Sequence, residues 1–427
     1  METLASQKDK WYCQKRAVSA TLLFSFVFVI LVSTAMLGGK IGLNSTADTS
    51  RDFFVEVFGS DVVGDGSQAR PFATITRASR AASPGSVIRV GPGHYNLSSV
   101  IYTGASGLQN KPIVYLSVVE WGARLHAAHA GEALWLNRGS FVEIRGFDIS
   151  GGHRTGVWTE GRSVTLSRNF IHDLGANVQW CGQTAAGIYA PASRVYTPQT
   201  FGSNVFTQNV IVRVGGAKCG AAPALADGIY TEGIRDTIAN NIILSNQGSG
   251  ITVSCSAPPC SALSVSVIFN LLANNTASGL SLLVRGTTSN KDAPVGLVAN
   301  NIVIFNSAYA LYSSQPFDGT SFSTMTNIIK GNSLGCSSQP SSFVCANQIF
   351  RAPGFSISTL FSSTTAAGLS RLLLDFVPKC HPLSPCIGSG SALPASPSPA
   401  TLVDFNNQPR LSSSPSDIGP FLSTNKC

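Results

Sequence analysis

Two short sequence words alternate through the middle of this chain at a nearly constant spacing. One is an asparagine followed by two apolar residues, and the other is a glycine followed by an aliphatic residue and a strand-forming residue. The tightest spacings are 13 residues from Gly228 to Asn241 and 9 residues from Asn241 to Gly250, and 13 + 9 gives a period of 22 residues. Periods of this length are typical of proteins built from stacked repeats. The words begin at Asn169, Asn209, Asn241, Asn270, Asn301 and Asn327, and at Gly156, Gly187, Gly228, Gly250 and Gly279.

This repeat predicts an all-β fold, a parallel β-helix. Short strands with asparagine or small residues at the corners suit coils that stack about 4.8 Å apart, with aliphatic side chains filling the interior. Asparagines that recur at one corner can hydrogen-bond from coil to coil. A leucine-rich repeat needs regularly spaced leucines, which are missing here. The composition agrees, because 44% hydrophobic and 12% charged residues exclude a largely disordered chain and a coiled coil.

An apolar segment precedes the repeats. Residues 17–37 contain no charged residue, and about 20 apolar residues span a bilayer as a helix. The basic flank before them predicts a single-pass type II membrane protein whose main part faces the lumen or the extracellular side. We therefore predict a cytosolic tail over 1–16, a transmembrane signal-anchor over 17–38, a stem over 39–51 and a β-helix domain over 52–427. A cleaved signal peptide, which would leave a secreted protein, is the alternative.

The cysteines fit an exported chain. Nine of the ten cysteines follow the apolar segment, and exported proteins use such residues as disulfides. Close spacing predicts three local pairs, and two insertion loops on neighbouring coils predict a fourth. Nine is an odd number, so we expect Cys427 to be free or intermolecular. The predicted pairs are Cys255–Cys260, Cys336–Cys345, Cys380–Cys386 and Cys181–Cys219. Glycosylation sequons occur at Asn44, Asn96 and Asn274.

Both ends of the repeat region resemble segments of a known superfamily. Residues 53–95, FFVEVFGSDVVGDGSQARPFATITRASRAASPGSVIRVGPGHY, read as a strand, a Gly/Asp turn, a helix and a second strand. They resemble the first segment of the right-handed parallel β-helix (pectate-lyase-like) superfamily, and 384–387 with 403–421 resemble its closing segment. Pro420-Phe421 departs from the usual ending, so the final coil is expected to close differently. The resemblance implies a right-handed parallel β-helix with an N-terminal capping helix. It does not specify an activity, because lyases, epimerases, hydrolases and non-enzymes share this fold.

The repeat alignment predicts where a site lies. Residues 156–161 (GVWTEG) and 228–233 (GIYTEG) match position by position. They place Glu160 and Glu232 in one column, two coils or about 10 Å apart. A second shared column holds aromatic residues whose faces can stack on sugar rings. A solvated Glu-Gly turn that recurs because the coils are related is the alternative. The catalytic candidates are Glu160, Glu232, Arg235, Lys218 and His172, and the substrate-binding candidates are Trp158, Tyr230, His153, Arg154, Arg162 and Asp227.

His172-Asp173 has the residue types of a general acid/base pair. The phase of the repeat favours a different role, because Asp173 (Asn169 plus 4) stacks on Arg213 (Asn209 plus 4) of the next coil. We therefore predict a cross-coil ion pair there. Solvated loop lysines are common, so Lys218 and Lys291 are weak candidates for the base of a lyase.

The balance of these features favours an enzyme that acts on a polysaccharide. For a lyase, the resemblance implies a Lys or Arg base and Ca²⁺, but the sequence contains no dense aspartate cluster, and we assign no metal ligands. The sequence words typical of polygalacturonases are also missing. The formal charge of +8 suits acidic glycans and is too diffuse to predict nucleic-acid binding. We expect a lyase or epimerase on an acidic glycan, with a non-catalytic glycan-binding or structural cell-surface protein as the alternative.

Overall fold

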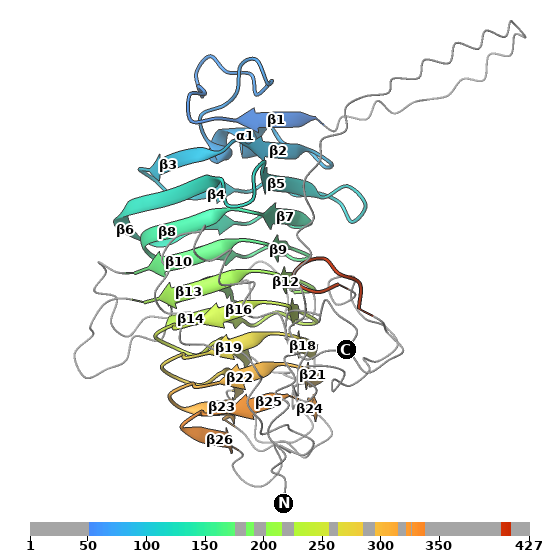
Figure 1. Ribbon diagram of the computed structural model, residues 1–427. Coiled ribbons are helices and arrows are strands. Elements are labelled where there is room, and N and C mark those ends of the chain that lie inside the picture. Colours follow the sequence, from blue (N-terminus) through green and yellow to red (C-terminus); the bar gives the residue numbers. More distant parts are fainter. Residues whose placement is uncertain are drawn as a thin grey trace, which may run out of the picture. The chain divides into compact units, whose positions relative to one another are not determined.

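The computed structural model divides the chain into two units, residues 1–48 and 49–427. The residues that it describes all belong to the second unit, and they form a stack of parallel strands with one short helix (Figure 1). In this part of the chain, no helix is long and apolar enough to cross a membrane. The predicted anchor, 17–38, lies outside it and stays a prediction. The described residues are 51–175, 185–191, 202–215, 226–255, 264–284, 295–314, 322–325, 327–337 and 403–410.

The strands belong to two hydrogen-bonded parallel sheets. The ten-stranded sheet runs in spatial order through β1 (Asp52–Val55), β2 (Val87–Val90), β5 (Ile113–Ser117), β7 (Val142–Arg145), β9 (Thr165–Ser167), β12 (Val205–Thr207), β15 (Thr237–Ala239), β18 (Ser264–Ile268), β21 (Val295–Ala299) and β24 (Phe322–Met325). The sixteen-stranded sheet runs through β25 (Ile328–Lys330), β22 (Ile302–Ile304), β19 (Leu271–Ala273), β16 (Ile242–Leu244), β13 (Val210–Val214), β10 (Phe170–Leu174), β8 (Asp148–Thr159), β11 (Ala185–Ala190), β14 (Ala226–Thr231), β17 (Ile251–Cys255), β20 (Leu280–Val284), β23 (Tyr309–Ser313) and β26 (Leu334–Ser337), and it includes β3 (Gly93–Leu97), β4 (Ile101–Thr103) and β6 (Ala123–Asn137).

The larger sheet consists of two faces joined at a corner. The long strands β6 and β8 run along both faces, whereas later coils use a separate short strand on each face. From β9 on, a coil therefore has three strands, as in β9-β10-β11 and then β12-β13-β14. The ten-stranded sheet forms the third face, on the right in Figure 1. Three parallel faces stacked in this way are the β-helix that the repeat predicted.

The helical segment expected near the start of the domain is α1 (Ile75–Ala81). Its N-cap is Thr74, whose side chain accepts a hydrogen bond from the backbone N–H of Arg77. Ile75 and Ala78 are buried and belong to the main hydrophobic core, so the helix packs directly against the first coils.

The asparagine word forms a buried ladder, as predicted. At each step, the Oδ1 atom of one asparagine accepts hydrogen bonds from the backbone N–H and the Nδ2 group of the asparagine one coil earlier. For example, Asn241 Oδ1 lies 2.9 Å from the Asn209 backbone nitrogen and 3.1 Å from Asn209 Nδ2. The residue before each of the first five asparagines, Asn169 to Asn301, has a positive φ, such as 58° at Asn240. This conformation is unfavourable for residues other than glycine, and the ladder stabilises the sharp corner where it occurs.

The glycine word packs against the asparagine word across the interior. A Cβ atom at Gly187 would lie 2.5 Å from Ile211 Cγ2 and 2.8 Å from the carbonyl oxygen of Gly228. Ile211 is the second apolar residue of the word that begins at Asn209. The two words therefore repeat together because the side chain of one fills the space that the other leaves empty.

Residues 403–410 return to the middle of the stack (red in Figure 1) and lie along its corner. Gln208 Nε2 donates to the carbonyl oxygen of Asp404 at 2.7 Å, and Asn240 Nδ2 donates to that of Val403 at 3.0 Å. The guanidinium of Arg410 lies 3.9 Å from the centre of the Phe269 ring. We call residues 403–410 the return segment.

Candidate functional site

An aromatic ladder lies on the outer face of β8, β11 and β14. Parallel pairing places Trp158 beside Tyr189 and Tyr189 beside Tyr230. Their ring centroids are 4.9 Å and 5.1 Å apart, and all three side chains are half-buried. The indole N–H of Trp158 has no hydrogen-bond partner among the described residues. The ladder therefore has one half-buried aromatic side chain per coil, with the Trp158 and Tyr189 rings edge-to-face and the indole N–H buried.

Glu160 and Glu232 occupy the predicted column, because each stands two residues after an aromatic residue of the ladder. One coil separates them, as predicted. Each carboxylate already has a partner: Glu160 accepts from Arg138 Nε at 2.8 Å, and Glu232 accepts from the Tyr230 hydroxyl at 2.7 Å. The structure thus brings both glutamates beside the aromatic ladder but does not join them to each other.

The ladder tyrosines are proton donors at neutral pH. Burial raises the pKa of Tyr230, and the negative charge of Glu232 raises it further. Burial and the charge of Glu232 also raise the pKa of Tyr189, against an opposing effect of Arg154. Arg154 is nearly buried, and its Nη2 atom lies 3.8 Å from Glu132 Oε1. The Arg154 guanidinium and the Glu232 carboxylate therefore lie close to the protonated phenols of the two ladder tyrosines.

The other predicted substrate-binding residues and the remaining catalytic candidates, Arg235 and Lys218, are more scattered. Arg162 and Arg235 are exposed at turns, and the Arg162 guanidinium lies 5.3 Å from the centre of the Phe141 ring. Asp227 is buried, and its Oδ1 atom accepts from the backbone N–H of Ser249 on the next coil at 2.7 Å. Burial raises the pKa of Asp227 to about 6. This location does not fit contact with a substrate. His153 lies in β8, and Lys218 and Lys291 lie outside the described residues.

His172 belongs to a compact ionic network on β10. Its ring nitrogens lie 2.7 Å from Asp173 Oδ2 and 2.8 Å from Asp148 Oδ1, and its ring stacks on Phe170 at 4.0 Å. Arg213 binds Asp173 through two hydrogen bonds of 2.6 Å and 2.7 Å, which confirms the predicted cross-coil ion pair. Burial lowers the pKa of His172, but the two aspartates outweigh it and the net shift is upward. Both nitrogens are occupied, so the network favours a structural role over acid/base catalysis.

Two further groups of predicted residues are only partly described. Cys255 and Cys336 are each disulfide-bonded, whereas the other cysteines lie outside the described residues, so the pairings stay predictions. Asn96 and Asn274 are exposed, and Asn44 lies outside the described residues. In the described part of the chain, no group of three or more His, Cys, Asp or Glu residues is placed to hold a metal ion.

The sequence reasoning missed Tyr189, the central rung of the ladder. The signal was present, because Gly187-Ile188-Tyr189 has the same form as Gly228-Ile229-Tyr230. A second buried ladder was also missed. It joins Asn246, Asn275, Asn306 and Asn332. Asn246 Oδ1 accepts from the backbone N–H of Val214, and each later Oδ1 atom accepts from the preceding asparagine.

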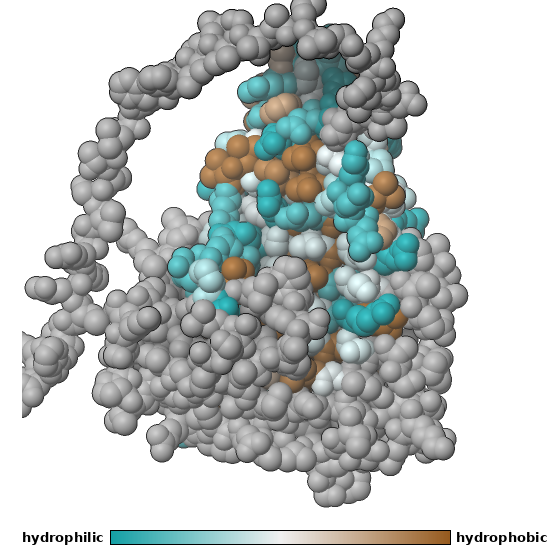
Figure 2. Space-filling model, turned by 90° about the vertical axis from the view of Figure 1, so that its right-hand side faces the viewer, coloured by the Kyte–Doolittle hydropathy of each residue, from teal (hydrophilic) through white to brown (hydrophobic). Residues whose placement is uncertain are grey.

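Exposed hydrophobic residues are concentrated in the first coils. Most of the large ones precede residue 120, and they include Phe58, Val62 and Val63. Figure 2 turns the side of the ten-stranded sheet toward the viewer, and hydrophobic residues there gather in the upper part among hydrophilic ones. This side contrasts with the ladder face, where aromatic residues follow one column.

The strand stack described above defines the fold class of this protein, a parallel β-helix with three stacked faces. A crystal structure of the pectate lyase Pel9A is similar to this chain with a TM-score of 0.56 and 15% identity over 88% of this chain and 97% of that one. XylC in complex with xylose has a TM-score of 0.47 and 12% identity over 67% and 66% of the two chains. A rhamnogalacturonan lyase has a TM-score of 0.41 and 16% identity over 74% and 92%. At these identities the likeness shows the fold alone.

Residues 57–100 match the model of a family described as a protein of unknown function (DUF1565). No curated protein matches the chain. The match covers the loop before α1, the helix itself and the strands β2 and β3. It therefore concerns the first coil and not the ladder face.

Proposed function

We propose that this protein binds a polysaccharide across the aromatic ladder. The observation that carries the proposal is the continuous column of Trp158, Tyr189 and Tyr230, with ring centroids 4.9 Å and 5.1 Å apart. Aromatic side chains combine a large apolar face with a polar tip, which suits the apolar face and hydroxyl groups of a pyranose ring. A polysaccharide lying along the stack would contact one aromatic residue per coil.

We further propose that the glycan is acidic. Arg154, which pairs with Glu132, lies close enough to Tyr189 to affect its pKa, so a positive charge beside the ladder would favour a uronate carboxylate. In a β-elimination, a base removes the proton next to that carboxylate and a proton donor protonates the leaving oxygen. Lys218 is our proposed base, and Ca²⁺ is the cation that such a lyase would add.

Non-catalytic binding is the second candidate function, and one observation favours it. The carboxylates of Glu160 and Glu232 both accept hydrogen bonds from neighbouring side chains, which suits a fixed binding surface. An epimerase would need the same proton removal as a lyase, followed by return of a proton to the other face of the sugar ring.

The remaining parts of the proposal concern export. A membrane anchor over 17–38, or its cleavage, would place the domain in the lumen or outside the cell. Disulfides and N-linked glycans on Asn44, Asn96 and Asn274 would follow from that compartment. We also propose that α1 closes the N-terminal end of the hydrophobic interior, because Ile75 and Ala78 belong to the core.

Binding of the full chain to polygalacturonate, alginate and neutral glycans tests the ladder. We expect Trp158→Ala and Tyr189→Ala to weaken binding of one acidic glycan by about tenfold or more, since such a contact contributes roughly 1–3 kcal/mol. Tyr312→Ala is the matched control. Tyr312 stands in the same column, separated from Tyr230 by Thr252 and Ser281. Equal loss in all three variants, or no loss in any, would contradict the proposal.

The ultraviolet absorbance of unsaturated uronate ends, measured with and without Ca²⁺, tests the lyase. Glu160→Gln and Glu232→Gln then separate the two functions. An enzyme would lose turnover and largely keep binding, whereas a binding protein would lose affinity. No absorbance change from folded protein on any uronate polymer would refute the lyase and leave epimerisation or binding alone.

A further inference from the structure

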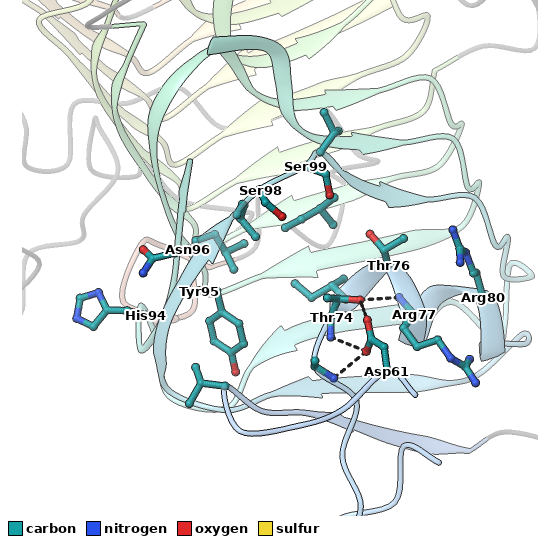
Figure 3. Close-up of a pocket in the computed structure, with 17 residues that line it drawn as sticks. Asp61, Thr74, Thr76, Arg77, Arg80, His94, Tyr95, Asn96, Ser98 and Ser99 are labelled. Atoms are coloured by element: carbon teal, nitrogen blue, oxygen red, sulfur yellow. Dashed lines mark hydrogen bonds between the residues drawn. The ribbon is translucent and has the colours of Figure 1, made fainter. Parts of the chain in front are cut away.

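A separate cavity of about 640 Å³ lies at the first coil, between α1 and β3. This volume falls within the range of small-molecule sites, which is about 300–1,000 Å³. Figure 3 shows α1 and the loop before it on one side, and β3 with the residues that follow it on the other. The cavity shares no residue with the aromatic ladder.

The inner part of the cavity is apolar. It is lined by Ile75, Ile101 and Leu125, which are buried and belong to the main core. Tyr95 also lines it, and its hydroxyl donates inward to the carbonyl oxygen of Gly91 at 2.9 Å. The aromatic and aliphatic surface is therefore fixed in place and offers an apolar contact.

Two cations lie on the α1 side. Arg77 and Arg80 are three residues apart and so share one side of the helix. Neither has a carboxylate partner among the described residues, and the Arg77 guanidinium lies 4.5 Å from the centre of the Phe72 ring. Their positive charge is uncompensated by an ion pair, which favours an anionic ligand.

The one acidic residue of the lining, Asp61, is already hydrogen-bonded. Its carboxylate accepts from the backbone N–H groups of Ala73 at 2.8 Å and Thr74 at 3.0 Å, and from Thr74 Oγ1 at 2.6 Å. These bonds hold the loop against the start of α1 (Figure 3). His94 contacts Arg124 at 3.1 Å on the outer side. The balance of charge around the cavity remains positive.

The opposite side carries neutral polar groups. Ser98 and Ser99 line the cavity, and their side chains have no hydrogen-bond partner among the described residues, whereas the Asn96 side chain points away from α1 in Figure 3. In Figure 3 the hydroxyls of Ser98 and Ser99 point into the space between the two walls. They can donate to or accept from ligand hydroxyls.

We propose that this cavity binds a single uronic-acid residue, most simply the end of an acidic glycan. Its carboxylate would face Arg77 and Arg80, its hydroxyls would face Ser98 and Ser99, and its C–H face would lie on the apolar inner surface. A neutral sugar would leave the guanidiniums without an anion, and a fatty acid would leave the serine hydroxyls without partners. The proposal does not depend on the ladder, because the two sites share no residue.

Calorimetric titration of the full chain with digalacturonate and with galactobiose tests this proposal. The protein is prepared in a bacterial periplasm, where disulfides form and no N-linked glycan is attached at Asn96. We expect digalacturonate to bind and galactobiose to bind at least tenfold more weakly. The Arg77→Gln/Arg80→Gln double variant should weaken digalacturonate binding at least tenfold, and added salt should weaken it in the parent protein.

Arg70→Gln is the matched control, because Arg70 is an exposed arginine at the same end that does not line the cavity and pairs with Asp65. It should leave the affinity unchanged. Circular dichroism confirms that each variant is folded, and Arg80→Lys is a second test if the double variant unfolds. No digalacturonate binding, equal binding of galactobiose, or full affinity in the folded arginine variants would overturn the proposal. Loss of binding only in Trp158→Ala would assign it to the ladder instead.

Discussion

Replacing Asn241 with alanine should destabilise the middle of the stack strongly. The Asn241 side chain accepts from the backbone N–H and Nδ2 of Asn209, and its own Nδ2 donates to the carbonyl oxygen of Phe206 at 2.8 Å, that of Ala239 at 3.1 Å, and Asn270 Oδ1 at 3.0 Å. All of these partners are buried within the ladder region, so water cannot readily replace them.

The size of the stability loss in Asn241→Ala depends on which buried groups lose their only hydrogen bond. The backbone N–H of Asn209 is left buried without its acceptor, which costs about 1–3 kcal/mol. Asn209 Nδ2 keeps its bond to the carbonyl oxygen of Leu166 at 2.8 Å. The other four lost bonds contribute about 0.5 kcal/mol each, the low end of the usual range, because the two hydrogens of Asn241 Nδ2 are shared among three acceptors; the total is roughly 3–5 kcal/mol. This is a large part of the stability of an ordinary domain, about 5–15 kcal/mol.

Hydrogen exchange of the Asn209 amide is the sharpest assay, because a repeat stack can open locally. We expect its protection to fall by about two to three orders of magnitude, with a lower urea midpoint for the chain. Asn274→Ala is the control, since the exposed Asn274 side chain makes one hydrogen bond, of 3.1 Å, to Ser245. It should change stability by less than about 1 kcal/mol. Unchanged protection at Asn209 in Asn241→Ala would refute the stabilising role of the ladder.

Three further predictions concern stability. His172→Gln should cost about 2–3 kcal/mol near pH 6 in urea unfolding and less at higher pH. The effect of the two aspartates on the pKa of His172 outweighs that of burial and raises it above the usual 6.5. The protonated imidazole therefore stabilises the fold at low pH, and this stabilisation is lost as pH rises through the raised pKa. Burial raises the pKa of Asp236 and of Asp227 to about 6, so the folded parent protein keeps protons that the unfolded chain loses, and its stability should fall as pH rises from 4 to 6, by about 1–3 kcal/mol for each group. Asp236→Asn should remove about half of that slope; an unchanged slope would contradict the assignment. Gly187→Ala should destabilise the protein by about 1–3 kcal/mol and lower the thermal midpoint, because the added Cβ would lie 2.5 Å from Ile211 Cγ2. Gly104→Ala is the control: its Cβ would meet only the Tyr102 ring, at 3.2 Å, and the thermal midpoint should change little.

The periodic part of the fold could be predicted because its corners are chemically demanding. Each corner has a residue with a positive φ, followed by a side chain that must both donate and accept hydrogen bonds. Asparagine meets the second need, so Asn169, Asn209 and their counterparts recur at a regular spacing that can be seen in the sequence. The same phase placed Glu160 with Glu232 and Asp173 with Arg213. Register is a simple count along such a stack, so pairings two coils apart can be predicted from the sequence.

The parts that broke the phase could not be predicted. Asp227 precedes the corner glycine Gly228, and there the usual alternation of inward and outward side chains fails, so its carboxylate turns toward Ser249. The cavity beside α1 is formed by segments outside the repeat, and nothing in the sequence shows that Arg77 and Ser98 face one space. The second asparagine ladder was hidden because its members follow a strand instead of beginning a word.

The return segment changes how this protein can come apart. A stack in which each coil contacts only its neighbours can unfold from one end, one coil at a time. Here residues 403–410 bind Arg168, Gln208 and Asn240, so positions 163 to 237 residues apart in the chain are tied together. Unfolding from the C-terminal end must first break the hydrogen bonds of the return segment, and the coils between β10 and β19 should then unfold together. Pulled by its ends, such a chain should resist up to one large force and then extend abruptly, instead of lengthening in small even steps.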